Sequence, residues 1–362
     1  MLLTLLKILV TITLFVIMIS FGGGGWASEY KSSSNYTFDS VPDLKGKFAI
    51  VTGATGGLGL ITVRELVGKG AHVVATAKNE LKGQAAIQKI EGELKGNIGA
   101  GKLELAILDL SSLDSTNSFV KKFQKQHNSK NLDILILNAG LMVIGFPYQQ
   151  TIDGFETHFG ANYLGHFLLT KLLMPQIKKS GTRVVVVSAL AHENTYENGF
   201  SFNRLRNSNE SYNGYYAYAQ SKLANILFSN ELAERLSGTQ ATSNSLDPGI
   251  IKTELSRYSN SVSILNEINY FSIRRYIYQS SVFLNNRWII EPFLRVLELA
   301  YMNADMGALT QLYVATSPEL KGVTGKYFGP IAAMKTPSSL AMNVSLQKAL
   351  WQVSEKFVTK YK

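Results

Sequence analysis

The apolar and polar positions of this chain follow two alternating periods. Short apolar runs with β-branched residues, typical of buried strands, are separated by stretches in which apolar residues recur every three to four positions, as on one face of a helix. The predicted strands cover residues 48–52, 72–77, 103–108, 132–137, 183–188, 241–246 and 326–328. The predicted helices include residues 153–173, 215–236 and 346–358. Strands that alternate with helices in this way predict an α/β domain around a parallel sheet.

The first predicted strand runs into a glycine-rich turn. Gly53, Gly56, Gly57 and Gly59 follow it before the pattern becomes helical. Glycines allow positive φ angles and a close approach of the backbone to a pyrophosphate, and the free N–H groups of the next helix attract its negative charge. The turn therefore predicts a dinucleotide site, although glycine between a strand and a helix also occurs for steric reasons alone.

The first 27 residues predict a membrane-targeting segment. Residues 2–21 are apolar apart from Lys7 and a few hydroxyl residues, and a helix of this length would cross a hydrocarbon core about 30 Å thick. The stretch also fits a signal peptide with Ala27 at the cleavage position. We expect a transmembrane signal anchor or signal peptide over 1–27, a linker over 28–44 and one folded domain over 45–362. The expected location is a membrane, with the endoplasmic reticulum favoured, and the flanking charges leave the side of the domain open.

Composition narrows the classes of partner. The net charge of +10 raises nucleic acid as a partner, but the lysines and arginines are scattered without a basic helix, so no nucleic-acid binding is expected. The chain has no cysteine, which excludes disulfides, thiolate nucleophiles and cysteine metal sites. Its five histidines show no metal-ligand spacing, so no metal is expected. The sequence leaves homo-oligomerisation open.

Residues at the ends of the following strands predict how a cofactor is held. An NAD-binding fold would carry an acidic residue about 20 positions after the first glycine, to bind the ribose 2′-hydroxyl. Ala77 and Lys78 stand there instead, which favours NADP(H) over NAD(H), although Lys78 also fits an ordinary exposed lysine. Asp109 could accept from an adenine amine, and Asn138-Ala139-Gly140 ends the fourth strand. Both lie at strand ends where parallel sheets bind ligands.

A tyrosine and a lysine four residues apart carry the candidate chemistry. Tyr218 and Lys222 lie in the predicted helix 215–236, and their spacing places them on one face. A tyrosine is a poor acid or base at neutral pH, but a nearby ammonium favours the phenolate and is expected to lower its pKa by about 1–3 units from about 10. The phenol can then exchange a proton with an alcohol or carbonyl. Asn162, in the preceding helix, is predicted as a buried strut or a site residue.

Residues 254–295 depart from the alternation and are dense in aromatic and basic side chains. This composition predicts a substrate lid or a membrane-facing insertion, where amphipathic aromatics and arginines settle. An ordinary packed helix pair fits the segment equally well.

In this order, the motifs resemble the classical short-chain dehydrogenase/reductase family. They are Thr52-Gly53-x-x-x-Gly57-x-Gly59, Asp109, Asn138-Ala-Gly140, Asn162, Tyr218-x-x-x-Lys222 and Pro248-Gly-x-x-x-Thr253. The strings Asn162-Tyr-Leu-Gly-His-Phe-Leu-Leu-Thr170 and Gly325-Lys-Tyr-Phe328 look like the retinol dehydrogenase and WW-domain oxidoreductase branch. The spacing Gly53-x-x-Gly56-x-x-Gly59 also suits extended members such as epimerases, which usually lack the Asn-Ala-Gly string.

The resemblance implies a Rossmann-like, doubly wound α/β fold with seven parallel strands in a single domain, preceded by the N-terminal hydrophobic helix. It implies that Tyr218 is the general acid/base, that Lys222 lowers its pKa and holds the nicotinamide ribose, and that Asn162 anchors a water linked to Lys222. The residues implied to line the cofactor, besides Tyr218 and Lys222, are Gly53, Thr55, Gly57, Leu58, Gly59, Lys78, Asp109, Leu110, Asn138, Ala139, Gly140, Pro248 and Thr253.

One position departs from the family pattern. The family places its catalytic serine second in a Ser-Ser pair, and here the pair is Ser188-Ala189. Successive side chains of a strand face opposite ways, so Ser188 cannot simply replace the missing hydroxyl. The candidates for the catalytic role are Ser188, if the strand ends early enough for its side chain to reorient, and a nearby polar group such as His192 or Asn194. The loss of one donor to a developing oxyanion typically costs about 10²–10³ in rate. Asp247, where the branch usually has histidine, is a milder departure.

The leading hypothesis is a membrane-anchored NADP(H)-dependent oxidoreductase. It would transfer hydride between nicotinamide and a lipophilic alcohol or carbonyl compound, such as a retinoid, a steroid or another lipid. The rival hypothesis is a membrane-bound NADP-binding scaffold or sensor whose catalysis is weakened at Ala189. An extended-type epimerase or dehydratase is a third, and it would keep its cofactor bound without net consumption.

Overall fold

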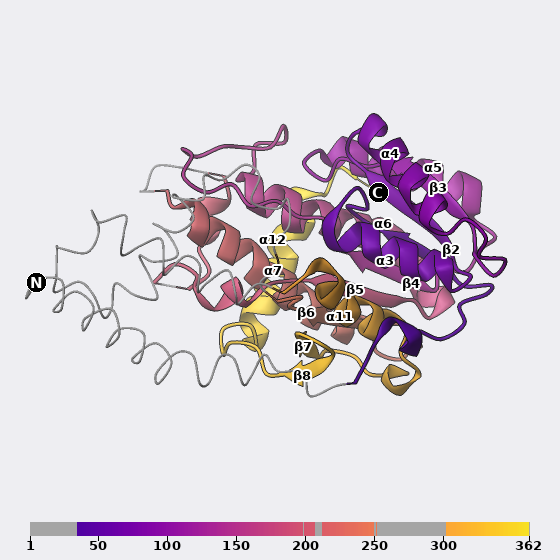
Figure 1. Cartoon of the computed structure of the whole chain (residues 1–362). Coiled ribbons are helices and arrows are strands. Elements are labelled where there is room, and N and C mark those ends of the chain that lie inside the picture. Colours follow the sequence, from indigo (N-terminus) through magenta and orange to yellow (C-terminus); the bar gives the residue numbers. More distant parts are fainter. Residues whose placement is uncertain (1–34, 198, 207–211, 250, 252–301, 362) are drawn as a thin grey trace, which may run out of the picture.

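The computed structural model describes residues 35–197, 199–206, 212–249, 251 and 302–361. An eight-stranded sheet runs through the middle of this domain, with helices packed on both faces (Figure 1). Its strands are β1 (Phe48–Val51), β2 (His72–Ala77), β3 (Leu103–Ile107), β4 (Ile134–Leu137), β5 (Arg183–Val187), β6 (Thr242–Leu246), β7 (Tyr327–Gly329) and β8 (Ala333–Lys335). The predicted single Rossmann-like α/β domain is confirmed.

The strand order is β3-β2-β1-β4-β5-β6-β7-β8. Neighbours from β3 to β7 pair in parallel, whereas β8 pairs with β7 antiparallel. The predicted seven-stranded sheet is therefore corrected to eight strands, because the chain turns back after β7 and adds a short edge strand. The winding direction reverses between β1 and β4, and open α/β sheets bind ligands at such a switch point.

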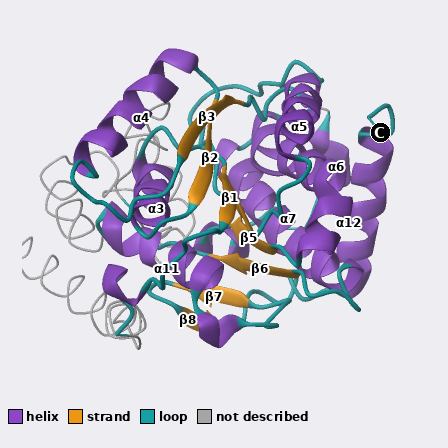
Figure 2. Cartoon of the chain, turned by 90° about the vertical axis from the view of Figure 1, so that its right-hand side faces the viewer, coloured by secondary structure: helices purple, strands orange, loops and turns teal. Residues whose placement is uncertain are grey.

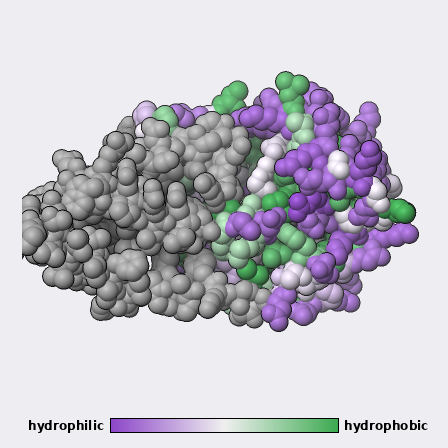
Figure 3. Space-filling view, in the orientation of Figure 1, coloured by the Kyte–Doolittle hydropathy of each residue, from purple (hydrophilic) through white to green (hydrophobic). Residues whose placement is uncertain are grey.

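Two apolar cores lie on the two faces of the sheet. Figure 2 shows α3, α4 and α11 on one side of the strands and α5, α6, α7 and α12 on the other. These helices are α3 (Gly57–Gly68), α4 (Glu80–Glu93), α5 (Leu113–His127), α6 (Gly165–Ser180), α7 (Gly214–Arg235), α11 (Ala304–Thr316) and α12 (Val344–Phe357). In Figure 3 the described surface is mainly hydrophilic, and large exposed apolar side chains such as Leu81 and Ile98 are few and separate in sequence.

The predicted helix at 153–173 has a different form. A π-helical segment, η3 (Phe159–Leu164), comes first, and α6 follows it directly and continues to Ser180. π-Helical turns widen a helix locally and are frequent at functional sites. The sequence periodicity did not reveal this segment, because its residues are all buried and show no polar face.

Part of the predicted linker packs on the domain. Val41 and Leu44 are buried in the core beneath α3, and the hydroxyl of Tyr36 lies 3.3 Å from Oγ1 of Thr316 on α11. The predicted anchor at 1–27 and the predicted lid at 254–295 lie outside the described residues. No described helix is long and apolar enough to span a membrane.

Candidate active site

The glycine turn lies at the switch point of the sheet, between β1 and α3. Gly53 and Gly57 adopt positive φ angles of 70° and 52°, and a Cβ at Gly59 would overlap the carbonyl oxygen of Gly53. A Cβ at Gly56 would meet nothing within 4 Å, so the space beside this residue is open. Because α3 begins here with no acidic residue in its first turn, its free N–H groups suit a pyrophosphate.

Side chains from three elements hold this turn. The hydroxyl of Thr52 accepts hydrogen bonds from the backbone N–H groups of Asn138 (2.9 Å) and Ala139 (3.0 Å). Nδ2 of Asn138 donates to the carbonyl oxygens of Thr52 (2.8 Å) and Gly53 (3.3 Å). Nε2 of Gln311, on α11, donates to Oδ1 of Asn138 at 3.0 Å. The Asn138 side chain therefore braces the turn, a role that its strand-end position did not reveal.

Lys78 and Asp109 form an ion pair across the ends of β2 and β3. Nζ of Lys78 lies 3.2 Å from Oδ2 of Asp109 and donates to Oγ of Ser111 at 3.1 Å. Burial opposes ionisation of Asp109, but hydrogen bonds from Ser111 and the charge of Lys78 hold its pKa below the ordinary value. The two residues predicted to bind neighbouring parts of a cofactor, its 2′-phosphate and its adenine, thus contact each other.

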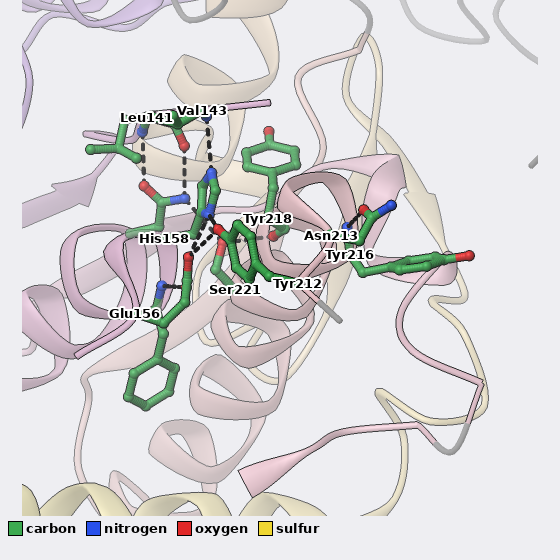
Figure 4. Close-up of polar contacts among 11 residues, drawn as sticks. Leu141, Val143, Glu156, His158, Tyr212, Asn213, Tyr216, Tyr218 and Ser221 are labelled. Carbon is green, nitrogen blue, oxygen red and sulfur yellow. Dashed lines mark hydrogen bonds and ion pairs between the residues drawn. The ribbon is translucent and has the colours of Figure 1, made fainter. Parts of the chain in front are cut away.

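Tyr218 and Lys222 lie together in the first turns of α7, as predicted, and both are buried. Nζ of Lys222 is 5.7 Å from the centre of the Tyr218 ring and donates to the carbonyl of Val187 at 3.3 Å. A Cβ at Gly140 would lie 3.5 Å both from this Nζ and from Oδ1 of Asn162, so the ammonium and the amide converge beside Gly140. Figure 4 shows the Tyr218 phenol pointing away from the hydrogen-bonded side chains around it.

The electrostatics of this pair differ from the expectation. Burial, and then the charge of Asp247, raise the pKa of Tyr218 above its ordinary value. Burial lowers the pKa of Lys222 to about 8, with Asp247 opposing the shift. The expected lowering of the Tyr218 pKa is therefore wrong for this structure, because burial disfavours the charged phenolate.

Asp247, which the sequence indicated only as a mild departure from the family pattern, influences the pKa values of both Tyr218 and Lys222. It directly follows β6, it is 3% exposed, and its Oδ1 accepts from the N–H of Gly249 at 3.0 Å. Burial raises its pKa, while the charges of Lys335 and Lys222 oppose that shift. The charge of Asp247 acts on both Tyr218 and Lys222, a consequence of β6 lying beside β5 rather than of local sequence.

Asn162 joins the loop after β4 to α7. Its Oδ1 accepts from the N–H of Leu141 (2.8 Å), and its Nδ2 donates to the carbonyl of Leu141 (3.0 Å) and to Oγ of Ser221 (3.0 Å). His166 bonds the Asn162 carbonyl through Nδ1 (3.1 Å) and lies 2.8 Å from the hydroxyl of Thr52 through Nε2. The buried asparagine is thus a strut, and it also presents Oδ1 beside Lys222.

The three candidate substitutes for the missing serine, Ser188, His192 and Asn194, are each engaged in hydrogen bonds within the protein. Oγ of Ser188 donates to the carbonyl of Lys222 at 2.7 Å and so faces the backbone of α7. Both ring nitrogens of His192 are engaged, Nδ1 with the carbonyl of Ala189 (2.9 Å) and Nε2 with the N–H of Ser338 (3.1 Å). The Asn194 side chain bonds the hydroxyl of Tyr215.

The remaining predicted residues border the site or lie outside it. Thr55 and Leu58 are half-buried in the glycine turn and in α3, and the Leu58 side chain packs against Gly307 of α11. Leu110 is buried against Gly165 at the start of α6, and Pro248 directly follows Asp247. Thr253 lies outside the described residues. Within the described ranges, no group of three or more histidine, aspartate or glutamate side chains is arranged to hold a metal ion.

This combination defines a class of protein. A glycine turn with an open helix N-terminus binds a dinucleotide, and a buried tyrosine and lysine at the same sheet edge provide proton transfer beside it. Such a site belongs to a nicotinamide-dependent oxidoreductase.

The chain belongs to the short-chain dehydrogenase/reductase family, in its retinol dehydrogenase-like branch. Residues 47–202 match the family model described as short chain dehydrogenase. Retinol dehydrogenase 14 of Homo sapiens is 36% identical over 87% of each chain. Polyprenol dehydrogenase of Danio rerio is 36% identical over 89% of this chain and 90% of its own. An uncharacterised protein of Mycobacterium paratuberculosis has a solved structure that superposes with a TM-score of 0.64, at 29% identity over 90% of this chain and 98% of its own.

Proposed function

We propose that the protein is an NADP(H)-dependent reductase or dehydrogenase of lipophilic alcohols and carbonyl compounds, with Tyr218 as its general acid/base. The observation that carries this proposal is the convergence of Lys222 and Asn162 beside Gly140 at the switch point of the sheet, with the centre of the Tyr218 ring 5.7 Å from Nζ of Lys222. Retinol and polyprenol, which appear in the names of two relatives, are both lipophilic alcohols. This similarity supports a lipid-like substrate here.

The residues of the glycine turn and of the β2 end would hold the cofactor. The open space beside Gly56 and the N-terminus of α3 suit the pyrophosphate. Lys78 and Ser111 form a cationic and hydroxyl pair that suits the 2′-phosphate of NADP(H), and β2 ends in Ala77 rather than in an acidic residue. Both groups also bond Asp109, so a 2′-phosphate would take the place of this carboxylate as the partner of Lys78. A charged hydrogen bond of this kind contributes about 1.5–3 kcal/mol.

Hydride chemistry is what the nicotinamide supplies when it is bound. Tyr218 gives a proton to the carbonyl oxygen in reduction and takes one from the alcohol in oxidation. Its raised pKa keeps the phenol protonated at neutral pH, the form that donates. Lys222 favours the phenolate that remains after donation, and Asn162 holds the loop that contains Gly140 against α7.

The proposal places the protein at a membrane, with the endoplasmic reticulum as the expected compartment. The support is the apolar segment at residues 2–21 and the aromatic and basic composition of residues 254–295. A lipophilic substrate partitions into the same phase, so a membrane-facing lid over the site would take it directly from the bilayer.

The test is turnover of NADPH in detergent with a panel of lipid aldehydes and ketones, for wild type and Tyr218→Phe. We expect wild-type oxidation of NADPH and a loss of about 10²–10⁴ in turnover in Tyr218→Phe, with NADPH binding kept. The rival scaffold predicts NADPH binding without oxidation and no change in Tyr218→Phe. The buried tyrosine and lysine pair, together with the dehydrogenase relatives, favour the enzyme.

A further inference from the structure

A buried polar cluster that the proposed mechanism does not use lies beside Tyr218. It consists of Glu156, His158 and Tyr212 (Figure 4). Oε1 of Glu156 lies 2.7 Å from Nδ1 of His158 and accepts from the hydroxyl of Tyr212 at 2.9 Å. Oε2 of Glu156 accepts from the backbone N–H of Phe159 at 2.7 Å. Glu156 and His158 are 3% and 0% exposed, so neither side chain reaches a substrate.

The hydrogen bonds of this cluster fix one tautomer of His158. The backbone N–H of Val143 donates to Nε2 of His158 at 2.9 Å. An amide N–H only donates, so Nε2 carries no proton, and the single proton of the neutral ring lies on Nδ1, where Glu156 accepts it. Burial opposes ionisation of Glu156, but the bonds from His158 and Phe159 hold its pKa below the ordinary value. The carboxylate of Glu156 therefore favours the tautomer of His158 whose Nε2 can accept the hydrogen bond from the N–H of Val143.

The segment from His158 to Asn162 holds the loop after β4 at two points. His158 binds Val143, and Asn162, four residues later, binds both backbone groups of Leu141. This loop continues directly from Gly140, beside which the catalytic groups converge. A shift of the loop therefore changes the position of the cofactor wall.

The loop in turn contacts the helix that carries the catalytic tyrosine. A Cβ at Gly214, the first residue of α7, would lie 2.6 Å from the carbonyl oxygen of Val143. The ring of His158 also stands edge-on to the ring of Tyr218, with centres 6.0 Å apart and planes at 74°. The first turns of α7 and the phenol thus rest on Val143 and His158.

We propose that Glu156 and His158 are positioning residues that set the place of Tyr218 by holding the N–H of Val143. The proposal rests on the proposed function, since it assigns a role in proton transfer by Tyr218. The pair acts through the loop and through α7, without contact to the reacting atoms. Misplacement of a reacting group by about 1 Å can cost about 10²-fold in rate, so a released loop would slow turnover strongly.

Two substitutions of His158 separate the two hydrogen bonds. Glutamine brings its amide oxygen near the place of Nε2 and can accept from Val143, whereas asparagine brings its amide near the place of Nδ1 and can only bond Glu156. We expect His158→Asn to lower NADPH turnover about 10²-fold and His158→Gln to recover about tenfold of that loss. Glu156→Gln should resemble His158→Asn, because a neutral amide no longer selects the tautomer.

The matched control is Tyr163→Phe. It removes a buried side-chain hydrogen bond, to Oγ of Ser354 at 2.7 Å, from the same segment as Asn162 but away from the loop. We expect its melting temperature to fall as in the His158 variants and its turnover to stay near that of wild type. A control that loses as much turnover as His158→Asn would overturn the proposal, since general loosening would then explain both.

Hydrogen exchange at the Val143 amide gives a readout that needs no activity. We expect faster exchange in His158→Asn than in wild type and His158→Gln, because only the asparagine variant leaves this N–H without its acceptor. Equal turnover in the two His158 variants, or equal exchange, overturns the positioning role. A wild type that binds NADPH and oxidises none overturns the proposed function and the role with it, and the exchange rates still report whether His158 holds the loop.

Discussion

The hydroxyl of Ser188 donates a 2.7 Å hydrogen bond to the backbone carbonyl of Lys222. The one serine at the end of β5 is thus directed at the helix that carries the catalytic pair and away from the cofactor side. Ala189 follows with an extended backbone, φ −164° and ψ 157°, so its side chain points to the opposite face. At these two positions, therefore, one side chain has no hydroxyl and the hydroxyl of the other is bonded to the backbone of α7.

We predict that Ala189→Ser raises the turnover of NADPH by about 10²-fold, the gain expected from one added oxyanion donor. The matched variant Ser188→Ala should lower the free energy of unfolding by about 1 kcal/mol through its lost hydrogen bond, with a much smaller effect on turnover. Steady-state kinetics and urea unfolding of both variants provide the comparison. If serine at 189 brings no gain, the reaction does not depend on this position.

Lys222→Met should produce a more stable but inactive protein. The folded pKa of Lys222, about 8, lies below its ordinary value of 10.5, so between these values the unfolded chain binds a proton that the native chain lacks. Below pH 8 the ammonium thus costs about 3 kcal/mol of stability, and this cost disappears as pH rises toward 10.5.

The measurement for Lys222→Met is urea unfolding at several pH values between 7 and 10.5. We expect the free energy of unfolding of the variant to exceed that of wild type at pH 7, and this difference to shrink with rising pH. The gain at pH 7 is reduced by the loss of the hydrogen bond from Lys222 to Val187. A variant that is less stable than wild type by the same amount at every pH would contradict the assigned cost of burying the ammonium.

Lys78→Ala should weaken the binding of NADPH about tenfold or more and leave NADH nearly unchanged, because only NADPH carries the 2′-phosphate that a charged hydrogen bond would hold. Lys82→Ala, which removes the same charge from an exposed position in the first turn of α4, is the control and should affect neither cofactor. Binding is measured by fluorescence titration. Equal losses for NADPH and NADH would count against the assigned preference.

His166 predicts an acid-sensitive component of stability. Burial lowers its folded pKa to about 4 from 6.5, so the unfolded chain takes up a proton first as pH falls. The contribution of neutral His166 to stability is complete above pH 6.5 and is lost as the pH falls through 4. Between pH 7 and 4.5 the free energy of unfolding falls by about 2 kcal/mol. The non-titrating variant His166→Gln should therefore close part of its stability gap to wild type as pH falls. Parallel unfolding curves across this range would refute the assignment.

Local sequence predicted the elements that depend on neighbours along the chain. The strand and glycine turn before Gly59 follow from short-range rules, and so does the four-residue spacing of Tyr218 and Lys222 on one helix. The eighth strand escaped prediction, since Ala333–Lys335 becomes a strand only by pairing with β7. The π-helical form of Phe159–Leu164 escaped as well, because its six residues are uniformly buried.

The sequence by itself determined the parallel α/β architecture, the glycine turn between β1 and α3, and the position of Tyr218 and Lys222 on one helix, because each is encoded in periodicity or in spacing within one element. Only the tertiary structure decided the charges around that pair. The charge of Asp247, which follows β6, acts on Tyr218 and Lys222, and burial raises the pKa of the phenol where local reasoning expected it to fall. The tertiary structure likewise brings Glu156 and His158 against the loop that contains Val143. These contacts join separate segments, so no local sequence pattern predicts them. Desolvation and long-range packing depend on the whole fold, and they set how the encoded residues work.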